Sequence, residues 1–334
     1  MDYKKLLGNN LNENYDFKKD CEKEIIFTSN FRFKFILIIL IIFILISLAT
    51  KYRLEKFNQI CLCSVAKEEN KYIREFVEHY QNYDVDKIYL YDNNDINGEK
   101  FEDVINDYIK SGFVELVNFK GVTQPQLKSY NDCYRRYNKF YDWLIYFDID
   151  EFIYLKDFKS FKLFLNDKRF KYCNRVQLNW IFYTDNNQLY YEDKPLKERF
   201  TEREPNARGK TKGKDQGIKS VLRGNLRDVE ITSPHFLYEK TRSCDGFGKR
   251  KRLTSIITLE SDFEYYYIDH YACKSTEEFI QNKLIRTDVY HKVDINMEKI
   301  KWYFEYNKIT KEKIDMIENR TKYNLTKYRS KIEK

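Results

Sequence analysis

The sequence predicts an α/β fold in which helices cover both faces of a sheet, and three observations support this prediction. From residue 59 onward, short apolar segments alternate with segments of helical periodicity. Short connections join them, as in folds built from successive strand–helix units. Apolar residues make up 42% of the 334-residue chain, which is enough for a sizeable core. Because such alternation favours parallel pairing, we expect the first strands to form a parallel sheet.

Apolar periodicity places the first strands and helices. The first helix has Ile73, Phe76, Val77 and Tyr80 on one face, and Gly112 is placed to end the second. The strands are expected at 59–66, 87–91 and 113–119, followed by a fourth that begins at 143, and the helices at 72–83, 101–112 and 124–141.

Shorter elements follow. We expect helices at 158–165 and 274–289 and strands at 175–183 and 263–271. Residues 201–219 combine glycines with basic side chains, which indicates either a mobile lid that contacts phosphate or a solvated charged loop. Residues 291–334 are predicted to form a charged helical region after a domain at 59–290.

The chain before residue 59 is predicted to hold a membrane anchor. Residues 1–34 are polar and of mixed charge, which is typical of a disordered tail in the cytosol. Residues 35–50 contain no charged side chain, and as a helix they span roughly 24 Å, a little short of the usual hydrocarbon thickness of a bilayer, a difference that snorkelling flanking residues can make up. A cleaved signal peptide and a buried core helix are the alternatives, which the long polar lead-in and the lack of a polar face disfavour. Residues 51–58 would form a short stem.

Cysteines and glycosylation sequons favour a luminal position for the domain. Of the 7 cysteines, only Cys21 precedes the apolar segment, and the even number that follows it permits disulfides whose pairing cannot be read from sequence. Sequons begin at Asn319 and Asn324. The basic residues that flank the apolar segment are nearly balanced and do not decide its orientation. We expect a single-pass type II protein of the Golgi or ER membrane.

Charge and residue spacing argue against three other classes of protein. The net charge of +8 is spread along the chain, so nucleic acid is not an expected partner. No Cys-x-x-Cys pair is present, which argues against a zinc site. The 4 histidines are dispersed, whereas a metal-dependent phosphohydrolase usually needs a second cluster of His and Asp. Phosphate groups of a small ligand and a membrane surface are equally consistent partners for this charge.

Three acids interrupt the apolar stretch of the fourth strand: Asp148, Asp150 and Glu151. On an extended chain Asp148 and Asp150 face the same way, roughly 6 to 7 Å apart, so both can reach a divalent cation. The side chain of Glu151 would point to the opposite side. Glu151 would then either support the metal ligands without contacting the metal or start a helix. A strand end followed by acids at a helix N-terminus is the alternative. Glu68 and Asp92 also follow strands, and such strand ends share one edge of a parallel sheet, which favours a ligand site.

Four segments of the chain resemble one enzyme family. They are residues 67–70 (Lys-Glu-Glu-Asn) with the helix that follows, Ile88–Asn93, Trp143–Phe152, and a C-terminal group made of Lys219–Arg223, His235, His270, Tyr271 and Ser275–Phe279. Together they are similar to glycosyltransferase family 92 and its family-2-like relatives. The resemblance implies a GT-A fold, which is a Rossmann-like mixed sheet with helices on both faces, here preceded by the single transmembrane helix.

By this resemblance, the chain is a metal-dependent glycosyltransferase. It would move a sugar from a UDP- or GDP-sugar to a hydroxyl of a glycan or glycoconjugate, with inversion. Mn²⁺ or Mg²⁺ would be held by Asp148, Asp150 and His270, although a hydrogen-bonded core histidine is the other interpretation of His270. A non-catalytic, membrane-anchored carbohydrate-binding or scaffold protein on the same fold is the alternative, and the intact acids argue against it.

The resemblance also implies residues for the donor and for proton transfer. The residues expected to contact the nucleotide-sugar are Lys67, Glu68, Asp92, Lys219 and Arg223. An inverting transfer needs a base near the acceptor hydroxyl, and Asp245 would supply it, with Asp185 and Glu151 as alternatives.

Overall fold

The computed structural model describes residues 33–49, 59–203, 217–235, 237, 242–251, 263–286, 295–321 and 323–332. The chain divides into two units, Met1–Glu55 and Lys56–Lys334. Most of the predicted tail, the whole predicted stem and most of the basic segment at 201–219 lie outside the described residues.

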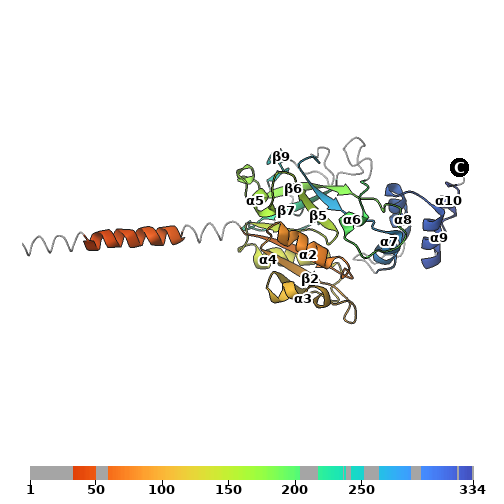
Figure 1. Ribbon diagram of the computed structural model, residues 1–334, viewed down its shortest axis with the longest axis horizontal. Coiled ribbons are helices and arrows are strands. Elements are labelled where there is room, and N and C mark those ends of the chain that lie inside the picture. The colour runs from red at the N-terminus through yellow and green to blue at the C-terminus, as the bar shows by residue number, and fades with distance from the viewer. Residues whose placement is uncertain are drawn as a thin grey trace, which may run out of the picture. The chain divides into compact units, whose positions relative to one another are not determined.

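The second unit is built on one mixed sheet, with helices packed against it (Figure 1). The strand order is β3-β2-β1-β4-β7-β6-β10-β5. Strands β1 to β4 pair in parallel, whereas β7 is antiparallel to both β4 and β6, and β10 is parallel to β6 but antiparallel to β5. The strands are β1 (Ile60–Ala66), β2 (Lys87–Asp92), β3 (Val114–Asn118), β4 (Trp143–Ile145), β5 (Glu151–Leu155), β6 (Arg175–Phe182), β7 (Ile218–Arg223), β8 (Ser243–Cys244), β9 (Arg250–Lys251) and β10 (Tyr266–His270). The predicted α/β class is confirmed: the first four strands form a continuous parallel part, and the later strands pair in both directions.

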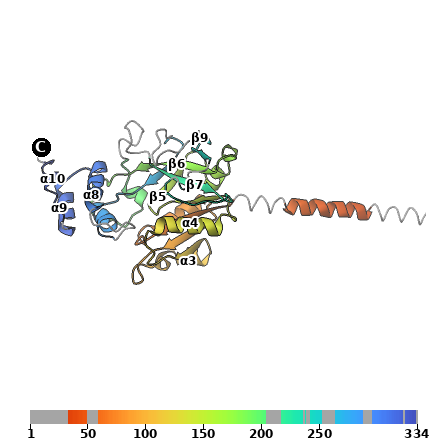
Figure 2. The same ribbon diagram turned by 180° about the vertical axis from the view of Figure 1, so that it is seen from behind.

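Helices cover both faces of the sheet, as predicted. Ile60 and Leu62 of β1 lie in one core with α2 and α3, while Cys61 and Cys63 lie in a second core with α4. Helix α4 is labelled in Figure 2, the view from behind. Successive side chains of a strand point to opposite faces, so β1 supplies both cores. The helices are α2 (Ile73–Asn82), α3 (Glu102–Lys110), α4 (Pro125–Tyr137), α5 (Phe161–Leu165), α6 (Leu196–Arg199), α7 (Thr276–Phe279), α8 (Ile295–Tyr306), α9 (Lys311–Arg320) and α10 (Thr326–Arg329), with a 3-10 turn at Lys168–Phe170 and a π-helix at Ile280–Ile285.

The C-terminal helices belong to the same compact unit as the sheet. Helices α7 to α10 form a third core that contains Ile300, Tyr303 and Ile314. A capping box between Ser275 and Glu278 starts α7, and the buried Glu278 carboxylate also pairs with Arg199 of α6. Helices α8, α9 and α10, which lie in the predicted charged helical region at 291–334, thus pack in the same compact unit as the predicted domain at 59–290.

Two disulfides tie the sheet to its neighbours. Cys63–Cys133 joins β1 to α4, and Cys173–Cys244 joins the segment before β6 to β8. Cys61 and Cys273 are buried free thiols. The structure thus supplies the pairing that the sequence left open.

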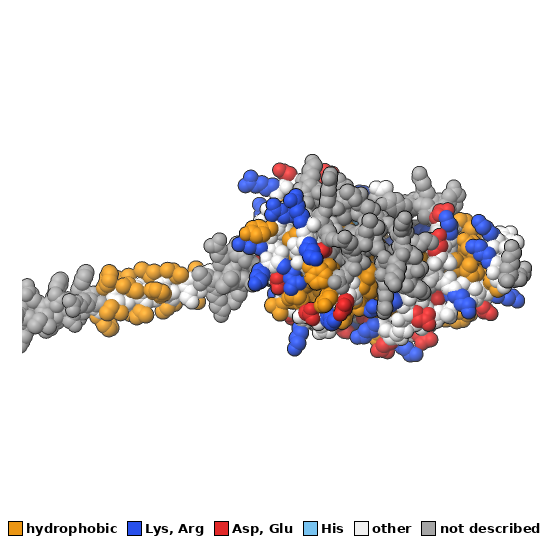
Figure 3. Space-filling view, turned by 90° about the horizontal axis from the view of Figure 1, so that it is seen from above, with side chains coloured by type: hydrophobic (Ala, Val, Ile, Leu, Met, Phe, Trp, Pro, Cys, Tyr) orange, Lys and Arg blue, Asp and Glu red, His pale blue; other side chains and the backbone are white. Residues whose placement is uncertain are grey.

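The first unit contains one described helix, residues 33–49. Its large apolar side chains are exposed, with exposed fractions between 40% at Ile39 and 69% at Phe33 (Figure 3). Within the described ranges, no helix combines the length and the apolar character needed to cross a membrane. The span predicted at 35–50 is therefore not confirmed.

Candidate functional site

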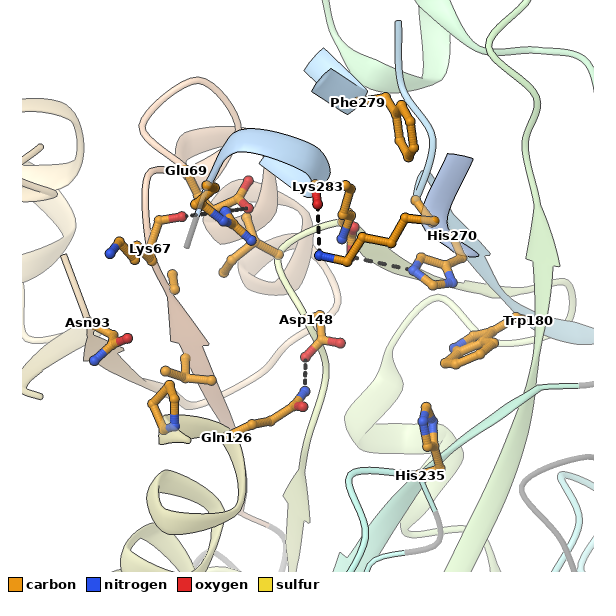
Figure 4. Close-up of a pocket in the computed structure, with 18 of the residues that line it drawn as sticks. Lys67, Glu69, Asn93, Gln126, Asp148, Trp180, His235, His270, Phe279 and Lys283 are labelled. Atoms are coloured by element: carbon orange, nitrogen blue, oxygen red, sulfur yellow. Dashed lines mark hydrogen bonds and ion pairs between the residues drawn. The ribbon is translucent and has the colours of Figure 1, made fainter. Parts of the chain in front are cut away.

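A pocket of about 480 Å³ lies at the edge of the sheet where β1, β4, β6 and β10 end. These strands end together because β6 and β4 are both antiparallel to β7, while β1 pairs in parallel with β4 and β10 with β6. Asp148 lies between Lys67 and Asn93 on one side and Trp180 and His270 on the other (Figure 4). The predicted site residues that line the pocket are Lys67, Asp148, Asp150 and His270.

The acidic motif forms a tight turn and not the end of an extended strand. Strand β4 stops at Ile145, and β5 begins at Glu151. The Glu151 backbone N–H donates to the Asp148 carbonyl at 3.1 Å, and the Glu151 carboxylate accepts from the Asp148 backbone N–H at 3.0 Å. The prediction that Glu151 points away or starts a helix was wrong, because the turn folds its buried carboxylate back beneath Asp148.

Lys219 is the buried counter-ion of this turn. Its Nζ lies 2.7 Å from Asp148 Oδ2 and 3.4 Å from Glu151 Oε2. Burial opposes ionisation of Asp148, but Lys219 holds the pKa of this carboxyl below its ordinary value. Burial raises the pKa of Glu151 well above its usual range despite Lys219, because Asp148 and Asp150 add to it. Burial alone would lower the pKa of Lys219, yet the two neighbouring acids raise it well above normal.

Helix α4 holds the other oxygen of Asp148. Gln126 Nε2 donates to Oδ1 at 3.0 Å, and the Tyr130 hydroxyl donates to the same atom at 3.1 Å. Sequence reasoning missed both donors. Tyr130 lies on the apolar side of the predicted helix, and its hydroxyl partner is visible only once the strand order is known.

Asp150 and His270 form the second pair in the pocket. His270 Nε2 lies 3.6 Å from Asp150 Oδ1. Burial opposes ionisation of Asp150, but His270 and the ammonium groups of Lys283 and Lys274 hold its pKa well below the ordinary value. Burial lowers the pKa of His270 to about 4, so the imidazole is neutral near neutral pH and its nitrogen can act as a ligand.

The donor set fits a divalent cation through Asp150 and His270. Ionised carboxylate and neutral imidazole are both ligands of Mn²⁺, and both side chains line the pocket. Asp148 is 34% exposed but already engaged by Lys219, Gln126 and Tyr130. Among the described residues, no group of three or more His, Cys, Asp or Glu side chains is placed to hold a metal. The predicted ligands thus share one pocket, but they are not assembled as a three-residue set.

Cationic side chains face this acidic centre. Lys283, Arg286 and Lys299 line the pocket together with Lys67. Arg286 Nη1 donates to the Lys67 carbonyl at 2.7 Å and pairs with Glu69 Oε1 at 3.1 Å. Sequence reasoning missed Lys283, Arg286 and Lys299 because they lie in the C-terminal segments, which only the fold brings to the ends of β1 and β4.

Glu68 and Asp92 lie beside the pocket, and their neighbours line it. The Glu68 backbone N–H donates to Asn94 Oδ1 at 2.7 Å, and the Asn94 N–H donates to Asp92 Oδ1 at 2.9 Å. Asp92 is buried and lies 3.3 Å from Lys120 Nζ. In place of these two acids, Glu69 and Asn93 line the pocket, one residue further along each loop.

Arg223 lies at the opposite edge of the sheet from Asp148. It is paired with Trp143, the first residue of β4, because β7 runs antiparallel to that strand. The guanidinium stacks 4.0 Å from the centre of the Trp143 ring and donates to the carbonyls of Phe170 and Cys173 at 2.8 Å. This position corrects the expectation that Arg223 contacts phosphate.

Asp245 also lies away from the pocket. It follows β8, which pairs with the first residues of β6, at the end opposite Phe182. Its Oδ1 accepts from the backbone N–H groups of Phe247 and Lys249 at 3.0 Å and so closes a turn. This position corrects the expectation that Asp245 reaches an acceptor hydroxyl.

Asp185, an alternative for the base, is occupied by structural contacts. It is buried 2.6 Å from Lys313 Nζ and accepts from the Tyr303 hydroxyl.

The mixed sheet and a pocket with acids and cations at its carboxyl edge define an α/β protein with a candidate site for an anionic ligand. A model of glycosyltransferase family 92 matches residues 58–325, and the chain therefore belongs to glycosyltransferase family 92. This confirms the family and the class of protein, a glycosyltransferase, that the sequence predicted.

Relatives and solved structures match more loosely. Glycosyltransferase family 92 proteins of Ricinus communis and of Oryza sativa subsp. japonica are 26% identical over 107 and 108 residues, which cover 31% of this chain and 18% of each relative. The chain thus spans less than a fifth of the length of these curated relatives. Among solved structures, S. aureus TarS 1–349 in complex with UDP-GlcNAc is 12% identical with a TM-score of 0.37, covering 78% of this chain and 79% of that one. The crystal structure of S. aureus TarS 1–349 alone gives a TM-score of 0.34 at 12% identity, covering 74% and 70%.

Proposed function

We propose that this chain transfers a sugar from a nucleotide-sugar, of the UDP or GDP type, to a hydroxyl of a glycan or glycoconjugate. The observation that carries the proposal is the meeting of Asp148 and Asp150 with Lys67, Lys283 and Arg286 in one pocket. Negative charge develops on the diphosphate as the sugar leaves, and positive groups around the leaving group stabilise that charge. Membership of the family supports the class of reaction.

Each group in the pocket has a role in this proposal. Mn²⁺ or Mg²⁺, when bound, would supply positive charge to the diphosphate, and Asp150 and His270 would hold it. Lys219 keeps Asp148 ionised and holds its carboxylate in place beside Asp150. Lys283 and Arg286 bind the phosphates from the C-terminal side, and Lys67 binds them from β1.

We propose that the transfer inverts the anomeric centre. The acceptor oxygen bonds to the anomeric carbon while the bond to the phosphate oxygen breaks, and the hydroxyl proton passes to a base. The family resemblance supports this stereochemistry. The product of an α-linked donor would then carry a β-linkage, and NMR of the anomeric proton tests it.

A donor screen tests the proposed function. The full chain is incubated with Mn²⁺, a panel of UDP- and GDP-sugars and mixed glycan acceptors, and released nucleotide is measured. We expect acceptor-dependent release with one donor class and its loss in Asp150→Ala. Release that survives unchanged in this variant, or no release with any donor, contradicts the proposal and favours a non-catalytic carbohydrate-binding protein.

We also propose that the domain works in the lumen of the Golgi or ER, attached through the apolar segment 35–50. Two disulfides in the domain support an oxidising compartment, and the exposed apolar side chains of residues 33–49 support attachment to lipid. Protease treatment of intact and opened vesicles tests this. Digestion of the domain in intact vesicles would exclude the luminal position.

A further inference from the structure

Aromatic side chains form a continuous wall on one side of the pocket. This aromatic wall consists of Trp180 and Phe182 of β6 and Trp302 of α8, all of which line the pocket. The ring centroids of Trp180 and Phe182 are 5.6 Å apart, and those of Phe182 and Trp302 are 6.3 Å apart. The His270 ring lies 4.7 Å from Trp180 and 4.8 Å from Phe182. The aromatic wall therefore ends against the imidazole that contacts Asp150.

The other side of the pocket is polar, and the acids separate the two sides. Strands β1 and β6 lie on opposite sides of β4 and β7 in the sheet order, and Asp148 follows β4 between them (Figure 4). Lys67 and Asn93 belong to the β1 side, and Trp180 belongs to the β6 side. A nucleotide-sugar has the same order of parts, since its diphosphate lies between the nucleoside and the sugar. With the diphosphate at the acids and the nucleoside toward β1, a sugar ring falls on the β6 side.

We propose that the aromatic wall binds the apolar face of a pyranose ring. This inference rests on the proposed function and specifies its substrate. A pyranose carries C–H groups on its faces and hydroxyls around its rim. The C–H face packs on aromatic rings, and the rim hydroxyls find polar partners in Asp148 and Gln126 across the pocket. The ring belongs either to the donor sugar or to the acceptor, and both present the same chemistry to the wall.

Gly217 allows Trp180 to occupy its place in the wall. A Cβ atom at residue 217 would lie 2.1 Å from Trp180 Cε3 and 2.3 Å from Cζ3, which is far inside van der Waals contact. The Trp180 backbone N–H also donates to the Gly217 carbonyl at 2.9 Å, so the two backbone segments cannot separate without losing this hydrogen bond. Gly217→Ala therefore displaces the indole without removing an aromatic residue.

Binding measurements on the full chain with Mn²⁺ test the inference. Calorimetry compares UDP and GDP with UDP-GlcNAc, UDP-galactose and GDP-mannose, and methyl glycosides of galactose, glucose and mannose are titrated in the presence of the nucleoside diphosphate. The variants are Trp302→Ala, Gly217→Ala and the conservative Trp302→Phe. The control is Tyr172→Ala, which removes an aromatic side chain that is 67% exposed outside the pocket.

We expect Trp302→Ala and Gly217→Ala to weaken binding of the sugar-bearing probe by roughly tenfold, while UDP or GDP binds as before. Trp302→Phe restores most of the affinity, and Tyr172→Ala changes nothing. Selective loss of sugar nucleotide affinity assigns the wall to the donor sugar. Selective loss of methyl glycoside affinity assigns it to the acceptor.

Two results would overturn the inference. One is an equal loss of affinity for UDP or GDP, which would mean that the aromatic wall binds the nucleobase of the nucleotide. The other is unchanged affinity for every probe in both variants, with circular dichroism showing that both are folded. In either case the parent chain still releases nucleotide in the donor screen. A parent chain that releases none fails the proposed function instead, so the two failures are distinguishable.

Discussion

The ammonium group of Lys219 lies 2.7 Å from the carboxylate of Asp148 and is shut off from solvent, with 1% of its side chain exposed. The Asp148 side chain lines the pocket and is 34% exposed, so the pair has one buried member and one accessible member. Breaking such a pair is costly, because the remaining charge loses its partner. We infer that Lys219 positions Asp148 and keeps it ionised.

Lys219→Met is expected to destabilise the fold and to stop transfer. We expect a loss of about 3 kcal/mol in the free energy of unfolding, at the low end for buried pairs because the Asp148 side chain is 34% exposed. The double variant with Asp148→Asn removes both charges, so it should recover stability without recovering transfer. Urea denaturation and nucleotide release measure the two effects.

Lys162→Met is the matched control for this experiment. Lys162 pairs with Asp86, and both side chains are partly exposed, at 29% and 24%. Surface pairs contribute about 0 to 1 kcal/mol, so this variant should unfold close to the parent. If Lys219→Met unfolds at the same urea concentration as Lys162→Met, the buried pair does not have the role we give it.

The sequence was sufficient to predict the sheet–helix alternation and to single out Asp148, Asp150 and His270, which line the pocket. The alternation follows from periodicity, and the carboxyl ends of parallel strands must share an edge, which places Asp148 and Asp150 at the edge where β1 also ends. His270 came from the family resemblance, and the structure adds the reason. Its strand, β10, is parallel to β6 and so ends at the same edge.

The misplaced residues share a physical cause, because strand direction and turns are not visible in periodicity. Arg223 ends a strand that runs antiparallel to β4, so the end of that strand is the wrong edge for the pocket. Asp245 follows β8, which lies beside the start of β6. Glu151 was assigned from extended geometry, but the chain turns there. Lys283 and Trp302 come from C-terminal segments whose docking depends on the whole fold.

Asp150→Asn is expected to weaken Mn²⁺ binding by more than about tenfold, because the carboxylate charge is lost while the side-chain shape is kept. Removal of Mn²⁺ with EDTA should stop transfer by the parent chain. Paramagnetic relaxation of water protons measures the metal affinity directly, so the result does not depend on activity.

Asp245→Asn is the control for Asp150, since its carboxylate closes a turn away from the pocket. We expect parent-like Mn²⁺ affinity and parent-like transfer. An Asp150→Asn chain that binds Mn²⁺ as tightly as this control would exclude Asp150 as a ligand.

Arg223→Met separates a structural role from a role in donor binding. The guanidinium donates to two backbone carbonyls, and the substitution removes both of these hydrogen bonds, so we expect a loss of about 1–3 kcal/mol in stability. The KM for the donor should not change. Arg223→Lys keeps the charge but loses the forked geometry, so it should also be destabilised. A raised donor KM at unchanged stability would restore the phosphate contact that the structure argues against.

Asp142→Asn is expected to stabilise the protein near neutral pH. Burial raises the pKa of Asp142 to about 6, with Arg223 opposing the shift, against an ordinary value of 3.8. The folded state therefore holds this proton more tightly than the unfolded state, and stability falls as pH rises from 3.8 to about 6. Asparagine removes this penalty, so its melting temperature should exceed that of the parent near neutral pH and converge with it below pH 3.8. A difference that does not vary with pH would contradict this assignment.

The two disulfides form a matched pair for testing how α4 supports the site. Their sequence separations are 70 and 71 residues, so removing either one should cost a similar amount, about 2–5 kcal/mol. Only Cys63–Cys133 fixes α4, the helix that directs Gln126 and Tyr130 to Asp148. Replacing both of its cysteines by serine should lower transfer at temperatures where the protein stays folded. The same replacement at Cys173 and Cys244 should lower the melting temperature to a similar extent and leave kcat/KM unchanged. Equal loss of kcat/KM in the two double variants, measured well below their melting temperatures, would show that α4 does not depend on its disulfide to position Asp148.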